Sequence, residues 1–436
     1  MLNTPIFEKS GRCRRKVWYL SRKNITESGY SDSFPFPRMP KNTEYNKRFA
    51  APFGECVVDA VISRGRSIEL YDFHPSVKYA KFFASMNYKR AVAEGSGEIV
   101  RSASVISVNP EYNPGGAERP YVITLVPRQK TEKDYVRMLK KLSAASEEVA
   151  PPDAEMTSGC AGCEFFNRCF RMPENNIFSL VNLSFEKKLE LYKSGVVTYD
   201  DYMKGDTSPL CVAQIKGETR EVVNKKEINK FLSSLIKPVG FLDFETIMPL
   251  EPEFEGYRPH DRVVTQFSFH RKVGTRLTHA EFIGDGVKCP EESLIKALIT
   301  VAGKKGSILM YSQYEKICIE TLAKRYPEYS QQLKAIADRL VDLEVIFKNK
   351  YYYNRKMRGR SSLKIVVPAL FPDDAELNYS SGAVGDGAEA AKAYCQLKSM
   401  KKEDRKRLKA ELLKYCSIDT LAMVKIIDKL TEAVAE

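Results

Sequence analysis

The segment Gly240-Phe241-Leu242-Asp243-Phe244-Glu245-Thr246 determines how the second half of this 436-residue chain is interpreted. It is an apolar run with strand character that carries two carboxylates at positions i and i+2. Because side chains alternate along a strand, both acids should point to the same side of a sheet. A buried pair of like charges is costly, so a cation is expected beside them.

A second segment, Tyr415-Cys416-Ser417-Ile418-Asp419-Thr420, lies close to the C-terminus. Its surroundings have helical periodicity, so Tyr415 and Asp419, four residues apart, should share one face of a helix. Carboxylate oxygens are hard ligands that suit Mg2+ or Mn2+ rather than zinc or copper. The two segments together predict a divalent-metal site for phosphodiester cleavage. Taken singly, each is equally compatible with ordinary surface acids, because short patterns recur by chance.

Length, composition and charge set broader limits. A chain of 436 residues exceeds what one hydrophobic core usually holds, so two domains with a joining segment are expected, and 43% hydrophobic residues is a globular proportion. The net charge of +13 favours polyanionic partners such as nucleic acid, although many basic proteins bind none. No window has the apolar length of a signal peptide or a membrane span, which predicts a cytoplasmic protein without a membrane partner.

Periodicity and polar breaks divide the chain into three parts, which are 1–175, 176–235 and 236–436. The first part has helical patterns at 12–20 and 76–94 and strand patterns at 56–62, 67–73 and 102–108. The second is helical and charged and is interpreted as a connector. The third has strand patterns at 240–244, 263–270, 279–283 and 307–311 and helical patterns at 314–337 and 404–433. Strands mixed with helices predict an α/β fold.

The layout of residues 238–432 resembles that of the DEDD exonucleases, which have a ribonuclease H-like fold. Both have a strand with Asp-x-Glu, further strands, and a late helix with Tyr-x-x-x-Asp. The resemblance implies a mixed sheet flanked by helices, four acids that hold two Mg2+ or Mn2+ ions, and a tyrosine that positions the attacking water. Carried over residue by residue, the resemblance implies a 3′ to 5′ exonuclease whose catalytic set is Asp243, Glu245, Glu315, Tyr415 and Asp419, with the four acids as metal ligands.

Glu315 departs from the pattern of that superfamily. Its second motif normally ends in aspartate, whereas this chain has Tyr311-Ser312-Gln313-Tyr314-Glu315, one methylene longer, which leaves the second metal's geometry open. More closely, six ordered segments resemble an uncharacterised bacterial family that joins this domain to a RecB-like nuclease domain. The segments are FLDFET, VTQFSFH, MYSQYEK, VDLEVIF, SLKIVVPALFP and YCSIDTLAMV.

Cysteine spacing in the first part predicts a metal centre. Cys160, Cys163 and Cys169 form a C-x2-C-x5-C pattern, and Cys13 lies in the first expected helix. Four thiolates can complete the shell of a [4Fe-4S] cluster or of a tetrahedral Zn2+ site. One cysteine ahead of a nuclease-like core and three behind it resembles the iron-sulfur nucleases of the RecB-like class, which implies the cluster. That class occurs in bacterial helicase-nuclease complexes, which makes a helicase a candidate partner.

The same class, of the PD-(D/E)xK type, cuts DNA with an acid on one strand and acid-x-lysine on the next. Asp59 matches the first acid and Asp72 the second, but His74 stands where the lysine is expected. A histidine is shorter and mostly neutral, so it stabilises a phosphorane less well than an ammonium. This unit is therefore predicted to be a degenerate nuclease domain that binds nucleic acid, with residual cleavage as the alternative.

A segment between Phe347 and Arg360 interleaves cations with three consecutive tyrosines. Stacking surfaces beside phosphate-neutralising side chains suit a single strand, and a solvated loop whose tyrosines cover a core edge is the alternative. The residues predicted to bind nucleic acid are Lys350, Tyr351, Tyr352, Tyr353, Arg355, Lys356, Arg358 and Arg360.

The sequence thus predicts a two-domain nuclease that trims single-stranded DNA or 3′ ends by two-metal hydrolysis, in DNA repair, defence or nucleic-acid turnover, with RNA as an alternative substrate. A catalytically decayed binding or scaffolding protein is the rival hypothesis, favoured by Glu315 and His74. A third hypothesis places cleavage in the N-terminal domain instead.

Overall fold

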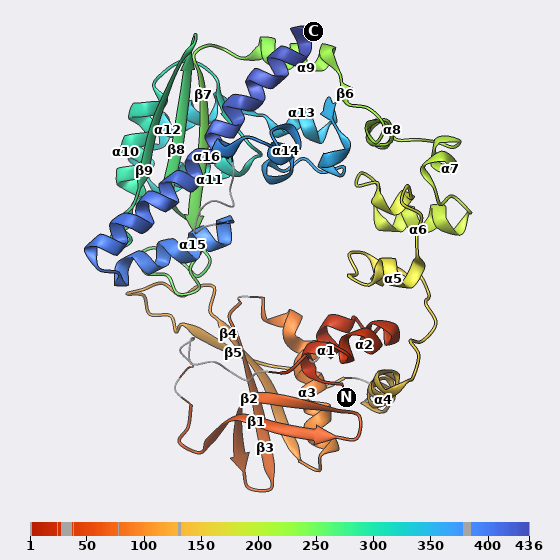
Figure 1. Cartoon of the computed structure of the whole chain (residues 1–436). Coiled ribbons are helices and arrows are strands. Elements are labelled where there is room, and N and C mark those ends of the chain that lie inside the picture. Colours follow the sequence, from red (N-terminus) through yellow and green to blue (C-terminus); the bar gives the residue numbers. More distant parts are fainter. Residues whose placement is uncertain are drawn as a thin grey trace. The chain divides into compact units, whose positions relative to one another are not determined.

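The computed structural model describes residues 2–23, 25–27, 37, 39–76, 78–129, 132–377 and 385–435 and divides into two compact units (Figure 1). Unit 1 consists of Met1–Met172 and Pro249–Asp261, and unit 2 of Pro173–Met248 and Arg262–Glu436. The segment interpreted as a connector, 176–235, therefore groups with unit 2.

Residues Pro249–Asp261 belong to unit 1 although strands of unit 2 precede and follow them in sequence. The hydroxyl of Tyr121 donates to Glu251 at 2.8 Å, and Arg258 forms an ion pair with Glu111 at 2.8 Å. These polar contacts account for the grouping. Sequence spacing gave no sign of it.

Unit 1 is built on a five-stranded sheet with the order β1-β2-β3-β4-β5. The strands are β1 (Thr43–Ala51), β2 (Gly54–Arg64), β3 (Ser67–His74), β4 (Val100–Val108) and β5 (Tyr121–Leu125). β3 and β4 are parallel and the other neighbours are antiparallel. The three strands predicted for this part are present as β2, β3 and β4. The edge strands β1 and β5 escaped prediction because most of their side chains are exposed and do not alternate cleanly.

Helices precede, connect and follow the strands of this sheet, and some of them pack against it. They are α1 (Thr4–Ser10), α2 (Arg14–Ser21), α3 (Phe83–Gly95), α4 (Glu132–Glu147) and α5 (Phe166–Phe170). α3 connects the parallel strands β3 and β4 and packs against β1, β2 and β4. It begins at Phe83, after a 3-10 turn (Tyr79–Phe82), and is shorter than the 76–94 predicted. α2 packs against α4.

Unit 2 begins with four short helices in the described residues, the first three of which surround a small core of their own, whereas the fourth packs against the last helix of the chain. They are α6 (Phe185–Lys193), α7 (Tyr199–Met203), α8 (Pro209–Gly217) and α9 (Lys225–Ser234), with the short strand β6 (Val222–Val223) between the last two. The core consists of Ile177, Leu180, Tyr199, Tyr202 and Cys211. β6 pairs with β12 (Tyr352–Tyr353), which ties this region to the later part of the unit.

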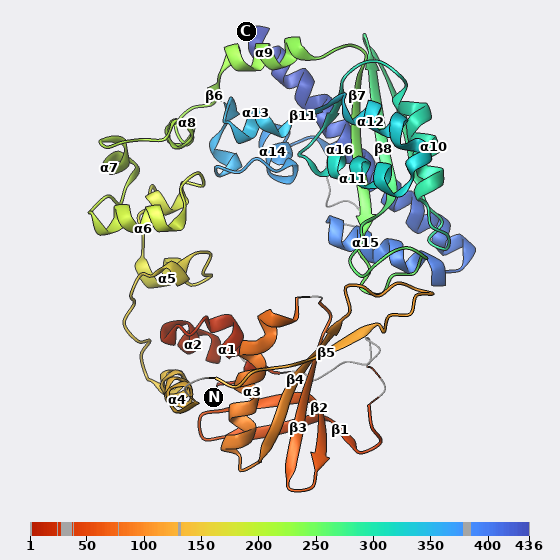
Figure 2. The same cartoon turned by 180° about the vertical axis from the view of Figure 1, so that it is seen from behind.

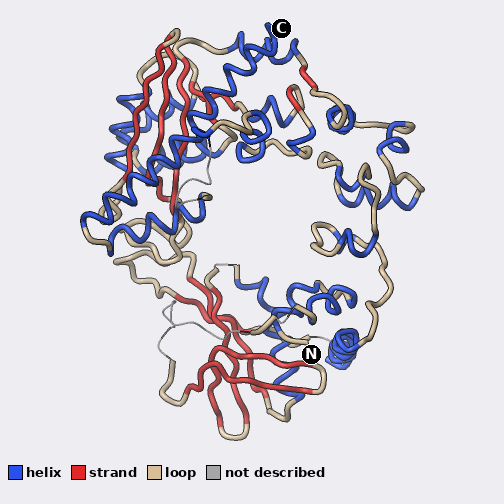
Figure 3. Tube along the Cα trace, viewed as in Figure 1, coloured by secondary structure: helices blue, strands red, loops and turns tan. Residues whose placement is uncertain are grey.

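The main sheet of unit 2 is mixed and has the order β11-β10-β7-β8-β9 (Figure 3). The strands are β7 (Val239–Ile247), β8 (Val263–Val273), β9 (Arg276–Ile283), β10 (Ile308–Met310) and β11 (Leu340–Asp342). β7, β8 and β9 form an antiparallel meander, whereas β10 is parallel to both β7 and β11. The four strands predicted here are present, and the three-residue β11 was missed.

The helices of this region are α10 (Glu291–Ala302), α11 (Tyr314–Arg325), α12 (Ser330–Ala337), α13 (Glu344–Lys348), α14 (Leu363–Leu370), α15 (Gly387–Gln396) and α16 (Lys402–Ala435). The single helix predicted at 314–337 is two helices. Pro327 starts a 3-10 turn between them, because proline lacks an N–H and disfavours helical geometry at the residue before it. No helix in the described part of the chain is long and apolar enough to cross a membrane.

Helices lie on both faces of the unit 2 sheet (Figures 1 and 2). α16 crosses β7, β8 and β9 on one face, and α10 and α11 pack on the other. Alternation along β7 supplies both layers, since Phe241 packs in the core that includes α16, whereas Leu242 and Phe244 pack in the core that includes α10 and α11. Positions 241, 243 and 245 therefore share the face that α16 covers.

Candidate metal centre

β7 places Asp243 and Glu245 on the sheet face covered by α16. Their partners across the sheet on β8 are Ser268 and Gln266, which are also polar and are buried. Gln266 donates to a backbone carbonyl of α16 at 2.8 Å, and the hydroxyl of Ser268 lies 2.7 Å from that of Thr420. These bonds fix the position of α16 against the sheet next to the two acids.

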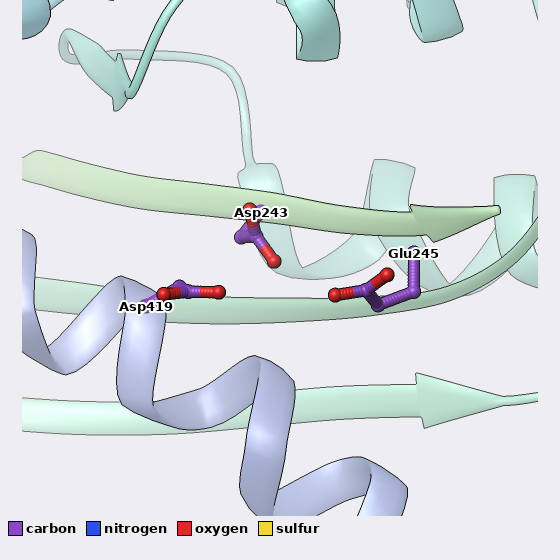
Figure 4. Close-up of side chains that lie close together, drawn as sticks. All are labelled: Asp243, Glu245 and Asp419. Atoms are coloured by element: carbon purple, nitrogen blue, oxygen red, sulfur yellow. The ribbon is translucent and has the colours of Figure 1, made fainter. Parts of the chain in front are cut away.

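α16 brings Asp419 to the acids of β7. Ligand oxygens of Asp243, Glu245 and Asp419 all lie within 4.8 Å of one another. Figure 4 shows the three carboxyl groups gathered around a common space between the strand and the helix. Hard oxygen atoms so grouped are what a divalent cation such as Mg2+ or Mn2+ requires. Three of the four predicted ligands are thus brought together.

The fourth predicted ligand, Glu315, lies outside that group of three but close enough to interact with it. It is in the first turn of α11, with 3% of its surface exposed. Its charge and that of Asp243 repel each other, as do its charge and that of Asp419. Its Oε2 atom is buried without a hydrogen-bond partner among the described residues. A buried carboxyl oxygen without a partner is costly, so this residue fits a site that receives a cation.

Burial and mutual repulsion raise the pKa values of Asp243, Glu245 and Glu315. Burial, followed by the charge of Asp419, raises the pKa of Glu245 to about 8. Burial likewise raises the pKa of Glu315 to about 8 and that of Asp243 well above its usual range. Without a cation the cluster therefore holds protons at neutral pH. A divalent ion would displace those protons, because it stabilises the ionised form.

Tyr415 and two residues that the sequence did not single out surround the acids. The thiol of Cys416 donates to Oδ2 of Asp243, with the sulfur 3.1 Å from the oxygen. Burial and then the charge of Asp419 raise the pKa of Tyr415, so its hydroxyl stays protonated. The ammonium of Lys364 lies 5.5 Å from the centre of the Tyr415 ring. Neither Cys416 nor Lys364 carried a spacing signal, because each comes into place only through the fold.

A buried polar network joins β8, β9 and α16 beside Asp419. Nδ1 of His270 lies 2.8 Å from the hydroxyl of Thr420, and Ser268 bridges Thr420 to Nε2 of His279. The two imidazole rings stack with their centres 4.3 Å apart. Burial lowers the pKa of His270 to about 4, so that ring is neutral at physiological pH. The sequence offers no companion spacing for these histidines, so their pairing arises only through the fold.

The acids predicted for unit 1 lie side by side on neighbouring strands and bond to backbone. Oδ2 of Asp59 accepts the N–H of Phe73 at 2.8 Å, and Oδ1 of Asp72 accepts the N–H of Asp59 at 3.2 Å. The backbone pairing of β2 with β3 extends only to Ala60 and Tyr71. The two side chains therefore connect the strands where the ladder ends.

A lysine and a glutamate complete this second cluster. Nζ of Lys89, on α3, lies 2.6 Å from Oδ2 of Asp72 and 3.7 Å from Oε1 of Glu27. Burial alone would lower the pKa of Lys89, but the charges of Asp72, Asp59 and Glu27 raise it, so the ammonium is retained. Burial, followed by the charge of Asp72, raises the pKa of Asp59 to about 7.

His74, predicted to stand in for a lysine, stacks on the ring of Phe82 with the ring centres 3.6 Å apart. The ammonium beside the acids comes from Lys89 instead. The sequence carries only a weak signal for Lys89, which is a cation among mostly apolar and small residues of the helical segment 83–95. No sequence pattern pointed to Glu27, which lies outside any regular element.

The four cysteines predicted to bind a metal centre all line one cavity of about 720 Å3. Cys13 is the N-cap residue of α2, and Cys160, Cys163 and Cys169 follow α4. The charges of Cys13 and Cys163 act on Cys169, and Arg15 hydrogen-bonds it. All ten cysteines are free of disulfides. Four thiols around one cavity fit a cluster or a Zn2+ ion.

The predicted nucleic-acid segment is only partly exposed. Tyr352 and Tyr353 are buried and pair with β6, and the buried ammonium of Lys350 donates to a backbone carbonyl at 3.0 Å. The stacking and phosphate-binding roles predicted for these three residues are wrong, because their side chains belong to the core. Tyr351 is half-buried. The exposed residues of the set are Arg355, Lys356, Arg358 and Arg360.

Comparison with known proteins bears on one part of the chain. Residues 240–362 match the model of a family described as a domain of unknown function, DUF2779. The matched stretch contains Asp243, Glu245 and Glu315, whereas Asp419 lies beyond it. No curated protein and no solved structure matches the chain. Three of the four acids therefore lie in the stretch that matches this family, whose description names no activity.

Proposed function

We propose that unit 2 is a metal-dependent nuclease of the DEDD type, a 3′ to 5′ exonuclease that removes nucleotides by two-metal phosphodiester hydrolysis. The observation that carries this proposal is the convergence of Asp243, Glu245 and Asp419, whose ligand oxygens lie within 4.8 Å of one another. The mixed sheet with helices on both faces is the arrangement that a ribonuclease H-like domain requires.

Each residue of the cluster has a role in that reaction. Asp243, Glu245, Asp419 and Glu315 would hold the divalent ions, with Asp243 as the central ligand because the charges of the other three acids all act on it. When bound, such ions polarise the phosphate, supply an activated water and stabilise the leaving oxygen. The protonated hydroxyl of Tyr415 is suited to orient that water as a hydrogen-bond donor, not to act as a base.

Nucleic acid is the proposed substrate because of the net charge of +13 and the exposed cations Arg355, Lys356, Arg358 and Arg360. Single-stranded DNA or a 3′ end is the form that suits an exonuclease site, with RNA as the alternative. The resemblance to DEDD exonucleases and RecB-like nucleases suggests a role in DNA repair, defence or nucleic-acid turnover in the cytoplasm. It also suggests a helicase as a candidate partner.

A second candidate function is cleavage by unit 1, and Lys89 is the observation that favours it. His74 is a poor substitute for the lysine of a PD-(D/E)xK site, but the ammonium of Lys89 lies 2.6 Å from Asp72. Glu27, Asp59 and Asp72 then supply three carboxyl groups for a cation. A lysine placed on the helix would restore the positive charge that the strand lacks, and the domain would not be degenerate.

We further propose that Cys13, Cys160, Cys163 and Cys169 hold a [4Fe-4S] cluster, with Zn2+ as the alternative. The shared cavity supports either metal centre. A cluster would tie the start of unit 1 to its end, because Cys13 precedes the sheet and the other three cysteines follow it. Iron, sulfide and zinc content, with the absorption spectrum of anaerobically purified protein, separates the two.

The direct test is the trimming of end-labelled single strands with and without Mn2+. Wild type, Asp243→Ala in unit 2 and Asp72→Ala in unit 1 are compared, with Asp338→Asn, an exposed acid at the end of α12, as the matched control. The proposal predicts metal-dependent, stepwise shortening by wild type, Asp72→Ala and Asp338→Asn. Asp243→Ala should lose at least about a hundredfold in rate, because the central acid of the metal site is removed.

The pattern of losses separates the candidate functions. Loss of cleavage in Asp72→Ala and Lys89→Met, with Asp243→Ala unaffected, would assign the activity to unit 1. Binding without shortening by wild type in either metal would favour a decayed binding or scaffolding protein.

A further inference from the structure

We propose that Lys364 binds a phosphate of the substrate strand next to the bond cleaved at the acid cluster, and so determines how tightly the strand is held there. The inference rests on the function proposed above and names a substrate-binding residue for it. Three features of the fold carry it: the position of the ammonium, the charge of the cluster and the location of the lysine within its helix.

The first feature is position. Lys364 is exposed, and its ammonium lies 5.5 Å from the centre of the buried Tyr415 ring. It also donates to the carbonyl of Gly385 at 3.3 Å, just before α15 begins at Gly387. A Cβ at Gly387 would lie 3.9 Å from Oε2 of Glu245. The ammonium is therefore held at the exposed margin of the cluster, between the acids and solvent.

The second feature is charge. The positive charge of Lys364 acts on Glu245 and opposes the rise in the pKa of that carboxyl. Two divalent cations would neutralise the four carboxylates, and the exposed ammonium of Lys364 would then lie beside a site without net negative charge. A phosphodiester carries one negative charge. An exposed cation beside a neutralised metal site is therefore placed to receive the phosphate that arrives with the substrate.

The third feature is the location of Lys364 in the first turn of α14 (Leu363–Leu370). A cation there opposes the helix dipole, whose N-terminal end favours negative charge. The helix itself therefore gains nothing from this lysine, which argues against a purely local structural role. In sequence, Lys364 follows the exposed cations Arg355, Lys356, Arg358 and Arg360. It is the last of a series that would follow a nucleic-acid backbone toward the acids.

The test compares Lys364→Gln and Lys364→Arg with wild type in two assays. Lys225→Gln is the matched control, because Lys225 is an exposed lysine in the first turn of another helix, α9. Binding of a fluorescent single strand is measured by anisotropy over a range of salt concentrations, with Ca2+ in place of Mn2+. Steady-state trimming with Mn2+ gives KM and kcat separately.

Loss of one phosphate contact has a defined signature. Lys364→Gln should weaken binding about tenfold and reduce the slope of log affinity against log salt by about one. KM should rise by a similar factor while kcat changes by less than about twofold, because the contact exists before the reaction begins. Lys364→Arg should restore binding and KM, and Lys225→Gln should match wild type.

The outcomes distinguish this inference from the function on which it rests. If wild type trims and Lys364→Gln keeps the wild-type salt slope and KM, the inference is overturned and the nuclease stands. If wild type binds but does not trim, the hydrolytic function is wrong and the salt slope still decides the role of Lys364. A wild-type protein that neither binds nor trims overturns both. Should Lys364→Gln unfold, Lys364→Met, which also lacks the charge, replaces it in both assays and is expected to show the same tenfold weaker binding and lower salt slope.

Discussion

Asp243 is a single residue at which the needs of folding and of metal binding oppose each other. It is half-buried, and the charges of Asp419, Glu315 and Glu245 all disfavour its ionisation. Its Oδ2 atom accepts a hydrogen bond from the thiol of Cys416, which is a weak donor. The protonated form is therefore preferred without a cation, and the ionised form becomes favourable only when a cation is bound.

The substitution Asp243→Asn tests this balance without activity as the readout. The acids of the metal-free cluster have pKa values raised above those of the unfolded chain, so the folded state retains protons that the unfolded state releases as the pH rises. Stability without metal should therefore fall from about pH 4.5 toward pH 8. Asp243→Asn should flatten this slope and raise the free energy of unfolding at pH 8 by roughly 1 kcal/mol, because one repelling acid is removed.

Chemical denaturation at pH 5 and pH 8, with and without Mn2+, measures these effects. Mn2+ should stabilise wild type more at pH 8 than at pH 5 and should leave Asp243→Asn nearly unchanged. An Asp243→Asn protein that is less stable than wild type at pH 8 without metal would show that the acid is held ionised by partners other than a metal ion.

At the scale of secondary-structure elements, the attachment of α16 to the sheet decides where Asp419 lies. Thr420, the next residue, is fully buried and lies within hydrogen-bonding distance of Ser268 and His270 on β8. Gln266 adds a bond from the same strand to the α16 backbone. The contacts between β8 and α16 are therefore hydrogen bonds instead of apolar packing. Because hydrogen bonds are directional, they determine the position of α16 near the acids.

His270 makes the stability of the contact between β8 and α16 depend on pH. Its pKa is lowered to about 4 in the folded protein, below the ordinary value of 6.5, so the unfolded state binds more protons between these values. Stability from this residue is complete above about pH 6.5 and is lost as the pH falls toward 4. His270→Asn should remove this part of the pH dependence, worth up to about 3 kcal/mol.

Denaturation curves at pH 7 and pH 5 provide the measurement. The matched control is His260→Asn, which changes an exposed histidine at a positive φ of 64° that asparagine tolerates. His260→Asn should follow the pH dependence of wild type. If His270→Asn loses as much stability between pH 7 and pH 5 as wild type does, the buried histidine does not contribute to it.

The sequence predicted elements well where local patterns were strong. The alternation around Asp243 and Glu245 placed both acids on one face of β7, and the spacing of Tyr415 and Asp419 placed them in one long helix. Spacing could not predict contacts that arise only in the fold, such as Lys364 beside Tyr415. The three tyrosines beginning at Tyr351 misled, because aromatic residues beside cations are equally common at a core edge, and two of these three are buried.

At the scale of the whole molecule, the two units contain acid clusters that are neutralised in different ways. The cluster of unit 1 includes the ammonium of Lys89, within ion-pairing distance of Asp72 and Glu27. In unit 2, Asp243, Glu245 and Asp419 lie together, with the charge of Lys364 acting only from the margin. Mutual repulsion among the unit 2 acids gives that cluster the stronger need for metal ions, which is why we propose hydrolysis for unit 2.

The most direct test of that assignment is anomalous scattering at the manganese edge from crystals soaked in Mn2+. The account predicts a peak about 2 Å from a carboxyl oxygen of Asp243, in contact with Glu245 and Asp419, that disappears in Asp243→Asn. A wild-type crystal with no manganese between these three acids, or with the acids turned away from one another, would contradict the account.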